Sequence, residues 1–305
     1  MAQPVFILGL QRSGTTWMAN QLEALPQVSA VAAAEHNGVH ESIFFSHFAR
    51  AFGPWEDAHA RRRFGEAFRH SDYWVLTELP DTTLTRCLAQ SATYADFFCA
   101  VMDRLAQGQG AQAWVEKSPH HTLMYLDLAL AIPQARFICV VRETEGMVLS
   151  RFSGFGRTPP TGLRRAADLV RATTVNTLFT RYLKEVSQQP NCMLVQYEAM
   201  RNNTLETNQA ILEFLGIPAL AADMKSRFEP NSSFSGAEKP CLSSLDRAVI
   251  AITTAVMKMV PLSALLRLHH WRGSKKGIVW PDWCWKRTGW HPDLLSIETP
   301  DKPDS

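Results

Sequence analysis

The chain alternates short apolar runs with longer amphipathic segments, a pattern typical of strands followed by helices. Continuous apolar runs at 5–8, 136–141 and 192–196 indicate strands buried on both faces of a parallel sheet. A short run at 113–116 predicts a fourth strand. Because short strand–helix connections give right-handed crossovers, we expect an α/β, three-layer fold with a central parallel sheet flanked by helices.

Apolar residues recur at helical spacing between these runs. The expected helices span 14–25, 122–132, 143–152, 163–186 and 204–215. Two further segments lie outside the strand–helix alternation: a mostly helical insertion at 37–107 and a helical, Trp-rich segment at 240–295. We therefore expect one domain over 1–295, followed by a disordered tail at 296–305.

Composition excludes some classes of function. The chain has 305 residues and a formal net charge of +2, which gives no argument for nucleic-acid binding. None of its six cysteines forms a C-x-x-C pair, and the N-terminus lacks a signal-peptide pattern, so we expect reduced thiols and a cytoplasmic protein. Charged residues interrupt the apolar stretch at 245–268, which argues against a membrane span. Nothing in the sequence determines the oligomeric state.

The first apolar run leads into a loop that is built to hold an anion. Gly9 and Gly14 have the spacing of a nucleotide-binding P-loop, G-x-x-x-x-G-K-[ST], but Thr15 stands at the position of the lysine. A glycine-rich turn that opens a helix directs several N–H groups at one point, and the helix dipole adds positive potential there. Ser13 and Thr16 supply further hydroxyl donors. Strand, loop and helix together favour an anion site over incidental glycines.

The cation of this loop differs from that of nucleoside triphosphatases. Arg12 lies inside the loop, where a planar guanidinium suits an oxyanion or a leaving-group oxygen. The only candidate for the acidic residue that holds magnesium is Glu116, which Lys117 follows. These two features argue against a magnesium-dependent nucleotide hydrolase.

A second candidate anion site follows the run at 136–141. Arg142 ends this strand, and Ser150 lies eight residues further on, about two helical turns away. An arginine at a strand end and a hydroxyl on the next helix can bind a second phosphate. Taken alone, a surface salt bridge for Arg142 and a solvated Ser150 explain the pattern equally well.

Together the two loops resemble the sulfotransferases that use 3′-phosphoadenosine-5′-phosphosulfate (PAPS). In that family a [KR]-S-G-T-T-W loop holds the 5′-phosphosulfate, and a strand ending in V-R with a serine eight residues on holds the 3′-phosphate. The matching segments here are Arg12-Ser-Gly-Thr-Thr-Trp17 and Val141-Arg142 with Ser150. The match is closest in style to the bacterial and tyrosylprotein branches, where the loop cation is arginine.

Further segments carry the resemblance over residues 4–220. Glu116-Lys-Ser-Pro119 looks like the family's E-K-x-P run, and Val195-Gln-Tyr-Glu198 looks like its R-Y-E-D run. Gln11 replaces a usual proline in the loop, and the C-terminal G-x-x-G-x-x-K motif is not present as such. Its nearest fits are the segment 233–239, which begins at Ser233, and the basic stretch 271–276.

The resemblance implies a function and roles for individual residues. It implies a metal-independent enzyme that moves a sulfuryl group from PAPS to an acceptor hydroxyl or amine of a small molecule, glycan or peptide. Arg12 and Lys117 would stabilise charge on the sulfuryl oxygens and the leaving phosphate, and Glu35 or His36 would be the general base. The implied PAPS-binding residues are Gln11, Arg12, Ser13, Gly14, Thr15, Thr16, Trp17, Arg142, Ser150, Tyr197 and Ser233.

Two other functions stay open on the sequence. One is a P-loop kinase or nucleotide hydrolase, and the other is a nucleotide-binding module that has lost its base. His36 and His40 have the i, i+4 spacing of a zinc helix, but the glutamate of H-E-x-x-H is missing and Gly38 lies between them, so we expect no metal site. The tryptophans near the C-terminus fit either core packing or an acceptor pocket.

Overall fold

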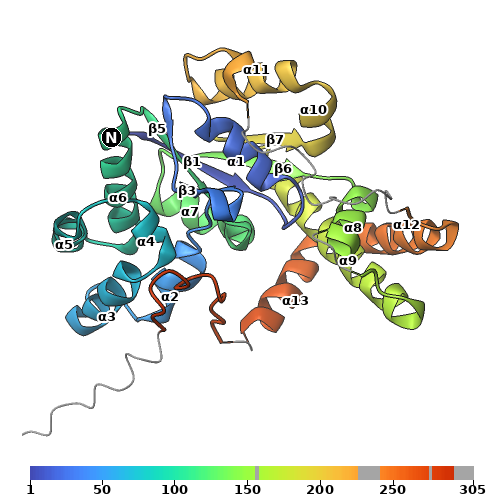
Figure 1. The fold of residues 1–305 in the computed structure, drawn as a ribbon. Coiled ribbons are helices and arrows are strands. Elements are labelled where there is room, and N and C mark those ends of the chain that lie inside the picture. Colours follow the sequence, from blue (N-terminus) through green and yellow to red (C-terminus); the bar gives the residue numbers. More distant parts are fainter. Residues whose placement is uncertain (155–157, 226–240, 275–276, 292–305) are drawn as a thin grey trace, which may run out of the picture.

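The computed structural model describes residues 1–154, 158–225, 241–274 and 277–291. Its centre is a parallel sheet of five strands in the order β2-β5-β1-β6-β7 (Figure 1). These strands are β1 (Gln3–Leu8), β2 (Val28–Ser29), β5 (Ala113–Lys117), β6 (Arg136–Val141) and β7 (Cys192–Gln196). The expected α/β fold with a central parallel sheet is confirmed, and β2 is an edge strand that the apolar pattern did not indicate.

Helices cover both faces of this sheet. They are α1 (Thr15–Glu23), α6 (Tyr94–Gln109), α7 (Tyr125–Ala131), α8 (Thr144–Ser153), α9 (Gly162–Val186), α10 (Tyr197–Asn202) and α11 (Thr204–Leu215). Alternation along β1 sorts its side chains into two cores. Val5 and Ile7 pack with residues of α1 and α11, whereas Phe6 and Leu8 pack with residues of α6, α7 and α9. This two-sided burial explains why β1 is a continuous apolar run.

The expected helical insertion follows the first βα unit. Its helices are η2 (Phe44–Phe48, a π-helix), α2 (Ala49–Ala51), α3 (Ala58–Arg69), α4 (Asp72–Leu76), α5 (Asp81–Gln90) and α6. Phe44, Phe64 and Phe97 are fully buried in its core, with ring centroids 5.1–6.0 Å apart. The insertion therefore has a dense aromatic core, which is continuous with that of one face of the sheet.

A small hairpin joins the edge strand β2 to the insertion. Strands β3 (Ala32–Ala33) and β4 (Gly38–Val39) pair antiparallel around the short 3₁₀ helix η1 (Ala34–His36). Asn37 has a φ of 57°, in the left-handed region that lets the chain reverse. Asn20 of α1 holds the hairpin, because its side chain donates to the Asn37 carbonyl and accepts from the Val39 N–H. The reversal separates Glu35, at the tip of the hairpin, from Glu41, which follows β4.

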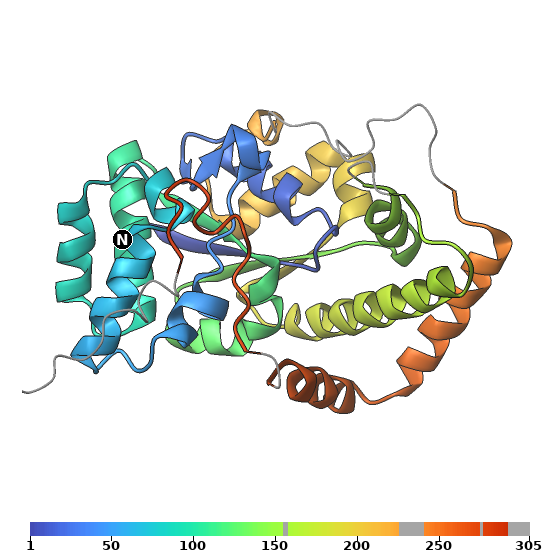
Figure 2. The same cartoon turned by 60° about the horizontal axis from the view of Figure 1, so that its bottom comes forward.

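The described C-terminal part of the chain, from residue 241 onward, packs first against α9 and then against the helical insertion. After η5 (Ala221–Asp223), helices α12 (Ser244–Met259) and α13 (Leu262–Ser274) pack against α9. Residues 277–291 then run back over the insertion (Figure 2); we call this segment the strap. Among the described helices, none is by itself long and apolar enough to cross a membrane. Ser233 and the tail at 296–305 lie outside the described residues.

Candidate active site

The candidate site lies at the carboxyl edge of the parallel sheet. The connection from β1 runs toward β2 on one side, and the connection from β6 runs toward β7 on the other, so the strand order reverses between these neighbouring strands. Ligands of open α/β sheets bind at such a switch point. The loop 9–14 after β1 and Arg142 after β6 both lie there, as the sequence predicted.

Glycine is required at both ends of the loop 9–14. A Cβ on Gly9 would lie 2.7 Å from the Val140 carbonyl oxygen, a backbone atom that cannot move aside. Gly14 has a φ of 100°, and a Cβ there would lie 2.4 Å from Cδ2 of Tyr197. Arg12 also has a left-handed backbone, with a φ of 77°. A non-glycine residue in this conformation is uncommon and occurs preferentially at functional sites.

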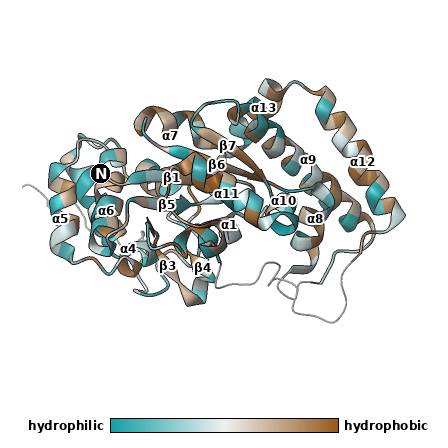
Figure 3. Cartoon of the chain, turned by 90° about the horizontal axis from the view of Figure 1, so that it is seen from above, coloured by the Kyte–Doolittle hydropathy of each residue, from teal (hydrophilic) through white to brown (hydrophobic). Residues whose placement is uncertain are grey.

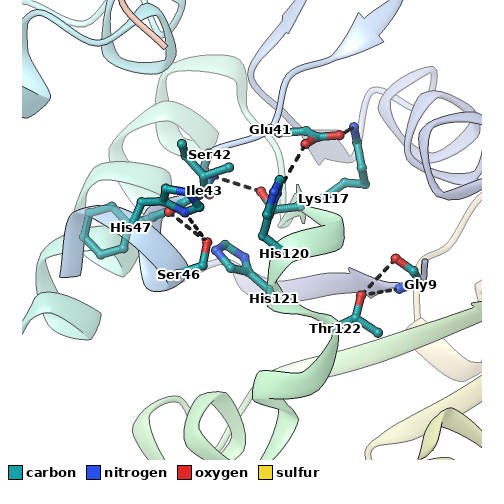
Figure 4. Close-up of polar contacts among 12 residues, drawn as sticks. Gly9, Glu41, Ser42, Ile43, Ser46, His47, Lys117, His120, His121 and Thr122 are labelled. Carbon is teal, nitrogen blue, oxygen red and sulfur yellow. Dashed lines mark hydrogen bonds and ion pairs between the residues drawn. The ribbon is translucent and has the colours of Figure 1, made fainter. Parts of the chain in front are cut away.

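Thr122 fixes the start of this loop. Its hydroxyl accepts a hydrogen bond from the Gly9 N–H and donates one to the Gly9 carbonyl, both at 2.9 Å (Figure 4). Both polar groups of Gly9 are therefore satisfied by one side chain of η3 (Pro119–Met124). Sequence reasoning missed Thr122, because only the fold brings η3 to β1.

The loop leaves one buried donor available for a ligand. Ser13 is 1% exposed, and among the described residues no hydrogen-bond partner reaches its hydroxyl oxygen. Thr15 and Thr16 form the first turn of α1, where free N–H groups and the helix dipole favour an anion. A buried polar group without a partner costs free energy, which an oxyanion bound at this turn would recover. The loop thus fits a phosphate or sulfate group.

The two arginines that the sequence singled out meet at this loop. Nε and one terminal nitrogen of Arg12 donate to the Ser150 hydroxyl on α8, at 3.0 and 2.8 Å. Arg142 donates to the Arg12 carbonyl at 3.1 Å. Arg12, Arg142 and Ser150 therefore form one connected cluster rather than two separate sites. The Arg12 side chain points to Ser150, the residue expected at the 3′-phosphate.

Tyr197, the first residue of α10, closes this cluster from the side of β7. The guanidinium of Arg142 lies 4.0 Å from the centre of the Tyr197 ring, and Trp17 packs edge-on against the same ring. Burial lowers the pKa of Arg142, although Tyr197 and Glu198 act in the opposite direction. The Nε of Arg142 is buried, and no described residue bonds to it. A cation with a donor to spare suits a second anionic group.

Lys117 meets a carboxylate that the sequence did not single out. Its ammonium group lies 2.9 Å from Oε1 of Glu41, and the Lys117 side chain is only 3% exposed (Figure 4). Oε2 of Glu41 lies 3.9 Å from Nδ1 of His120, and the Glu41 side chain remains 24% exposed. A cation, a carboxylate and an imidazole therefore face one another next to the end of β5. Burial lowers the pKa of His120.

Behind this group, Glu116 is the centre of a buried hydrogen-bond network. Its carboxylate accepts from the hydroxyls of Ser42 and Ser118 and from Nδ1 of His121, at 2.7, 2.5 and 3.0 Å. The other His121 nitrogen, Nε2, accepts from the Phe45 N–H at 3.1 Å, so Nδ1 is the nitrogen that donates to Glu116. Burial raises the pKa of Glu116, but His121 and the hydroxyl donors outweigh it and lower the pKa overall. Glu116 is thus a structural carboxylate, with no role as a magnesium ligand in this arrangement.

The two candidate bases from the sequence lie at the tip of the hairpin. The carboxylate of Glu35 forms an ion pair with Arg287 of the strap, and the Glu35 side chain is 52% exposed. His36 follows it in η1. The carboxylate on Lys117 is that of Glu41, six residues further along. Across the described part of the chain, no group of three or more metal-binding side chains is present.

The family model described as "Sulfotransferase family" matches residues 4–221, from the second residue of β1 to the first residue of η5. The chain belongs to the sulfotransferase family. The matched part of this sulfotransferase includes the loop 9–14, Lys117, Arg142 and Tyr197. No curated protein matches the chain.

Solved structures of sulfotransferases resemble this sulfotransferase at low sequence identity. A sulfotransferase from Alicyclobacillus acidocaldarius is 18% identical, with a TM-score of 0.47, over 89% of this chain and 100% of that one. The sulfotransferase domain of the Synechococcus PCC 7002 olefin synthase is 18% identical, with a TM-score of 0.46, over 84% and 96%. Mouse sulfotransferase SULT7A1 complexed with PAP is 14% identical, with a TM-score of 0.38, over 97% and 78%. Because all three scores are below 0.5, the family assignment rests on the family model.

Proposed function

We propose that this sulfotransferase transfers a sulfuryl group from PAPS to an acceptor hydroxyl or amine. The observation that carries the proposal is the convergence of Arg12, Arg142 and Ser150 on the glycine loop, where the buried Ser13 hydroxyl has no partner among the described residues. One doubly phosphorylated nucleotide needs two anion sites within its own length, and these residues lie in one connected cluster. PAPS, when bound, supplies the sulfuryl group and a phosphate that can leave.

The proposed division of roles follows the geometry. The backbone of the loop, with Ser13, Thr15 and Thr16, would hold the 5′-phosphosulfate at the N-terminus of α1. Arg142, through its buried Nε, and Ser150 on α8 would hold the 3′-phosphate. Arg12 connects the loop 9–14 to this second site, because its carbonyl contacts Arg142 and its guanidinium contacts Ser150. Tyr197 and Trp17 would border the nucleotide, as the family resemblance implies.

Lys117 and Glu41 are the proposed catalytic pair. Lys117 would stabilise negative charge on the sulfuryl oxygens. Glu41 would take the proton of the acceptor on Oε2, because Lys117 holds Oε1. Glu35 and His36 remain the alternative that the sequence favoured. The contact with Lys117 supports Glu41, and the pairing of Glu35 with Arg287 directs that carboxylate to the strap.

Nucleotide binding tests the proposal without knowledge of the acceptor. Adenosine 3′,5′-bisphosphate at about 100 times its Kd should stabilise the protein by about 2.7 kcal/mol, whereas Mg-ATP should have little effect. Arg142→Ala should weaken this binding, because it removes the guanidinium that contacts both the Arg12 carbonyl and the Tyr197 ring. Thermal-shift titration measures both effects. A larger shift with Mg-ATP would instead support a kinase or nucleotide hydrolase.

Two matched substitutions test the base. A radiosulfate transfer screen over sugars, phenols, lipids and peptides first identifies an accepted substrate. With that substrate, Glu41→Gln should lower kcat by about 10²–10⁴, because it removes the proton acceptor, while nucleotide binding stays unchanged. Glu35→Gln is the control and should lower the rate far less. A larger loss of rate in Glu35→Gln than in Glu41→Gln would identify Glu35 as the base. Nucleotide binding without sulfuryl transfer to any acceptor would indicate a non-catalytic module.

A further inference from the structure

Helices α12 and α13 form a bent pair at one edge of the molecule, in which α12 lies far from the helical insertion and α13 leads back toward the strap (Figures 1 and 2). The two helices meet at an angle of 104° across the break at 260–261. One side of α12 packs against α9, and Asp246, Ile250 and Met257 are its buried residues. The opposite side of α12 faces away from α9.

The outward side of α12 is apolar. Four large hydrophobic side chains are exposed along it, with exposed fractions of 54–84%: Leu245, Ile252, Val256 and Met259. Their spacings of seven, four and three residues place them in one stripe along the helix. Hydropathy colouring shows hydrophobic residues along this helix at the rim of the molecule (Figure 3). An exposed apolar stripe of this length marks an interaction surface.

The outward side of α13 combines apolar and basic residues. Leu268 and Trp271 are 51% and 55% exposed and lie three residues apart on the same side of the helix. Arg267 and Arg272, both exposed, lie on either side of this pair around the helix axis. Tryptophan beside arginine is the arrangement that suits the boundary between lipid headgroups and acyl chains.

The charge of helices α12 and α13 indicates which kind of partner they bind. Residues 244–274 contain four cations, Arg247, Lys258, Arg267 and Arg272, and a single acid. That acid, Asp246, is buried and paired with Arg165 at 2.7 Å, so it does not offset the cations at the surface. Arg247 lies 3.4 Å from Glu145 of α8, so Lys258, Arg267 and Arg272 carry the net positive charge of this surface. The exposed surface is thus apolar and basic, which is complementary to an anionic lipid surface.

We propose that the bent pair α12–α13 docks on the surface of an anionic lipid bilayer. The stripe on α12 and the Leu268–Trp271 side of α13 enter the interface, and the cations contact lipid phosphates. The bend and the four cations oppose insertion across the bilayer. A second copy of the chain fits less well, because pairing these surfaces would bring like charges together. This inference is independent of the proposed reaction.

Vesicle co-sedimentation tests the proposal. The protein should bind vesicles of phosphatidylcholine and phosphatidylglycerol in equal parts, bind pure phosphatidylcholine far less, and dissociate at high salt. The double substitution Val256→Glu/Met259→Glu should lower binding on the order of tenfold or more, because it places acids in the apolar stripe. Arg267→Ala/Arg272→Ala should lower binding to the anionic vesicles on the order of tenfold and leave the weak binding to phosphatidylcholine unchanged.

The matched control makes the same chemical change elsewhere. Leu130 on α7 and Leu205 on α11 are 81% and 62% exposed, and Leu130→Glu/Leu205→Glu should leave vesicle binding unchanged. All variants change exposed residues, so circular dichroism melts should match the wild type. Equal vesicle binding by the stripe and control variants would overturn the proposal. So would a dimer in sedimentation velocity that the stripe variant disrupts, together with no vesicle binding.

Discussion

At the scale of the residue, the close approach of two backbones at Gly9 sets the shape of the anion loop. Alanine at this position would place its Cβ 2.5 Å from Thr15 Cγ2 and 2.7 Å from both Ser13 Oγ and the Val140 carbonyl. We expect Gly9→Ala to destabilise the protein by about 1–3 kcal/mol, because β1 and β6 must separate locally. Adenosine 3′,5′-bisphosphate should also bind more weakly, because Ser13 is displaced. Urea denaturation and nucleotide titration measure the two effects.

Gly108 offers a matched control for this substitution. It lies inside α6, and a Cβ there would meet nothing within 4 Å. Gly108→Ala should therefore stabilise the protein by roughly 0.5–1 kcal/mol through the lower entropy of the unfolded chain. If Gly9→Ala proved as harmless as Gly108→Ala, the close approach at the loop would not constrain its backbone.

The sequence was informative about residues of the loop and silent about Glu41. The spacing of Gly9 and Gly14 after an apolar run predicted an anion site, because local backbone geometry alone produces it. The position of Glu41 depends instead on the β3–β4 hairpin, whose strands have only two residues each and leave no periodic signal. The hairpin directs Glu35 to the strap and brings Glu41 to Lys117. Counting residues from the loop could not distinguish the two carboxylates.

At the scale of the element, the strap is held to the insertion by a few anchors. The Trp285 side chain is 4% exposed and donates to the Ala67 carbonyl at 3.0 Å. The Cys284 carbonyl accepts from the Asp72 N–H at 2.8 Å, and the Arg287 N–H donates to the Asp72 carboxylate at 2.9 Å. The C-terminal tryptophans at 280, 285 and 290 therefore pack with the insertion, which favours core packing over an acceptor pocket.

Removal of the main anchor should release the strap. Trp285→Ala leaves a large cavity beside Phe48 and Trp280. If the strap unfolds together with the domain, we expect the free energy of unfolding to fall by about 3–5 kcal/mol. If the strap opens alone, the free energy of global unfolding falls by less, and the amide hydrogen of Asp72 exchanges faster than in the wild type. Hydrogen exchange and urea denaturation together measure the effect. Lys286→Ala, at an exposed position next to Trp285, should change neither quantity.

Elements with strong periodicity were predicted well, and short or tertiary-dependent elements were not. The strands at 136–141 and 192–196 match the apolar runs residue for residue, because burial on both faces demands it. The expected helix at 122–132 is divided into η3 and α7, since Thr122 is positioned to bond Gly9. The edge strand β2 pairs through only two residues. Such a strand depends on the neighbouring β5 for its existence, which no local pattern reveals.

At the scale of the whole molecule, the Glu116 network joins the parallel sheet to the helical insertion. Glu116 belongs to β5, while Ser42 and Phe45 belong to the start of the insertion and His121 to η3. The sequence indicated each part separately, as a sheet and as a helical segment. It could not indicate how they are joined, because the bonds connect residues about 75 positions apart with no motif of their own.

This network should contribute to stability in a pH-dependent way. The pKa of Glu116 is lower in the folded protein than in the unfolded chain, so its contribution is fully present above the unfolded value and is lost as pH falls through the folded value. With an unfolded pKa of about 4.3, the loss begins below about pH 4.5. Glu116→Gln should lower the free energy of unfolding by about 3–5 kcal/mol at pH 7, because it breaks a buried charged network. The difference from the wild type should shrink as the pH falls below 4.5.

Urea denaturation at pH 7, 5.5 and 4 distinguishes this network from general acid sensitivity. Glu185 on α9 is exposed, so Glu185→Gln should follow the wild type at every pH and serves as the matched control. His121→Phe should reproduce much of the loss at pH 7, because it leaves the Glu116 carboxylate and the Phe45 N–H without their partner. A difference that grows as the pH falls from 7 to 4 would show that the carboxyl group is protonated in the folded protein, because its folded pKa would then lie above its unfolded pKa. In that case the two parts of the molecule would be joined by neutral hydrogen bonds, and the sheet and insertion would separate no more readily in acid than at neutral pH.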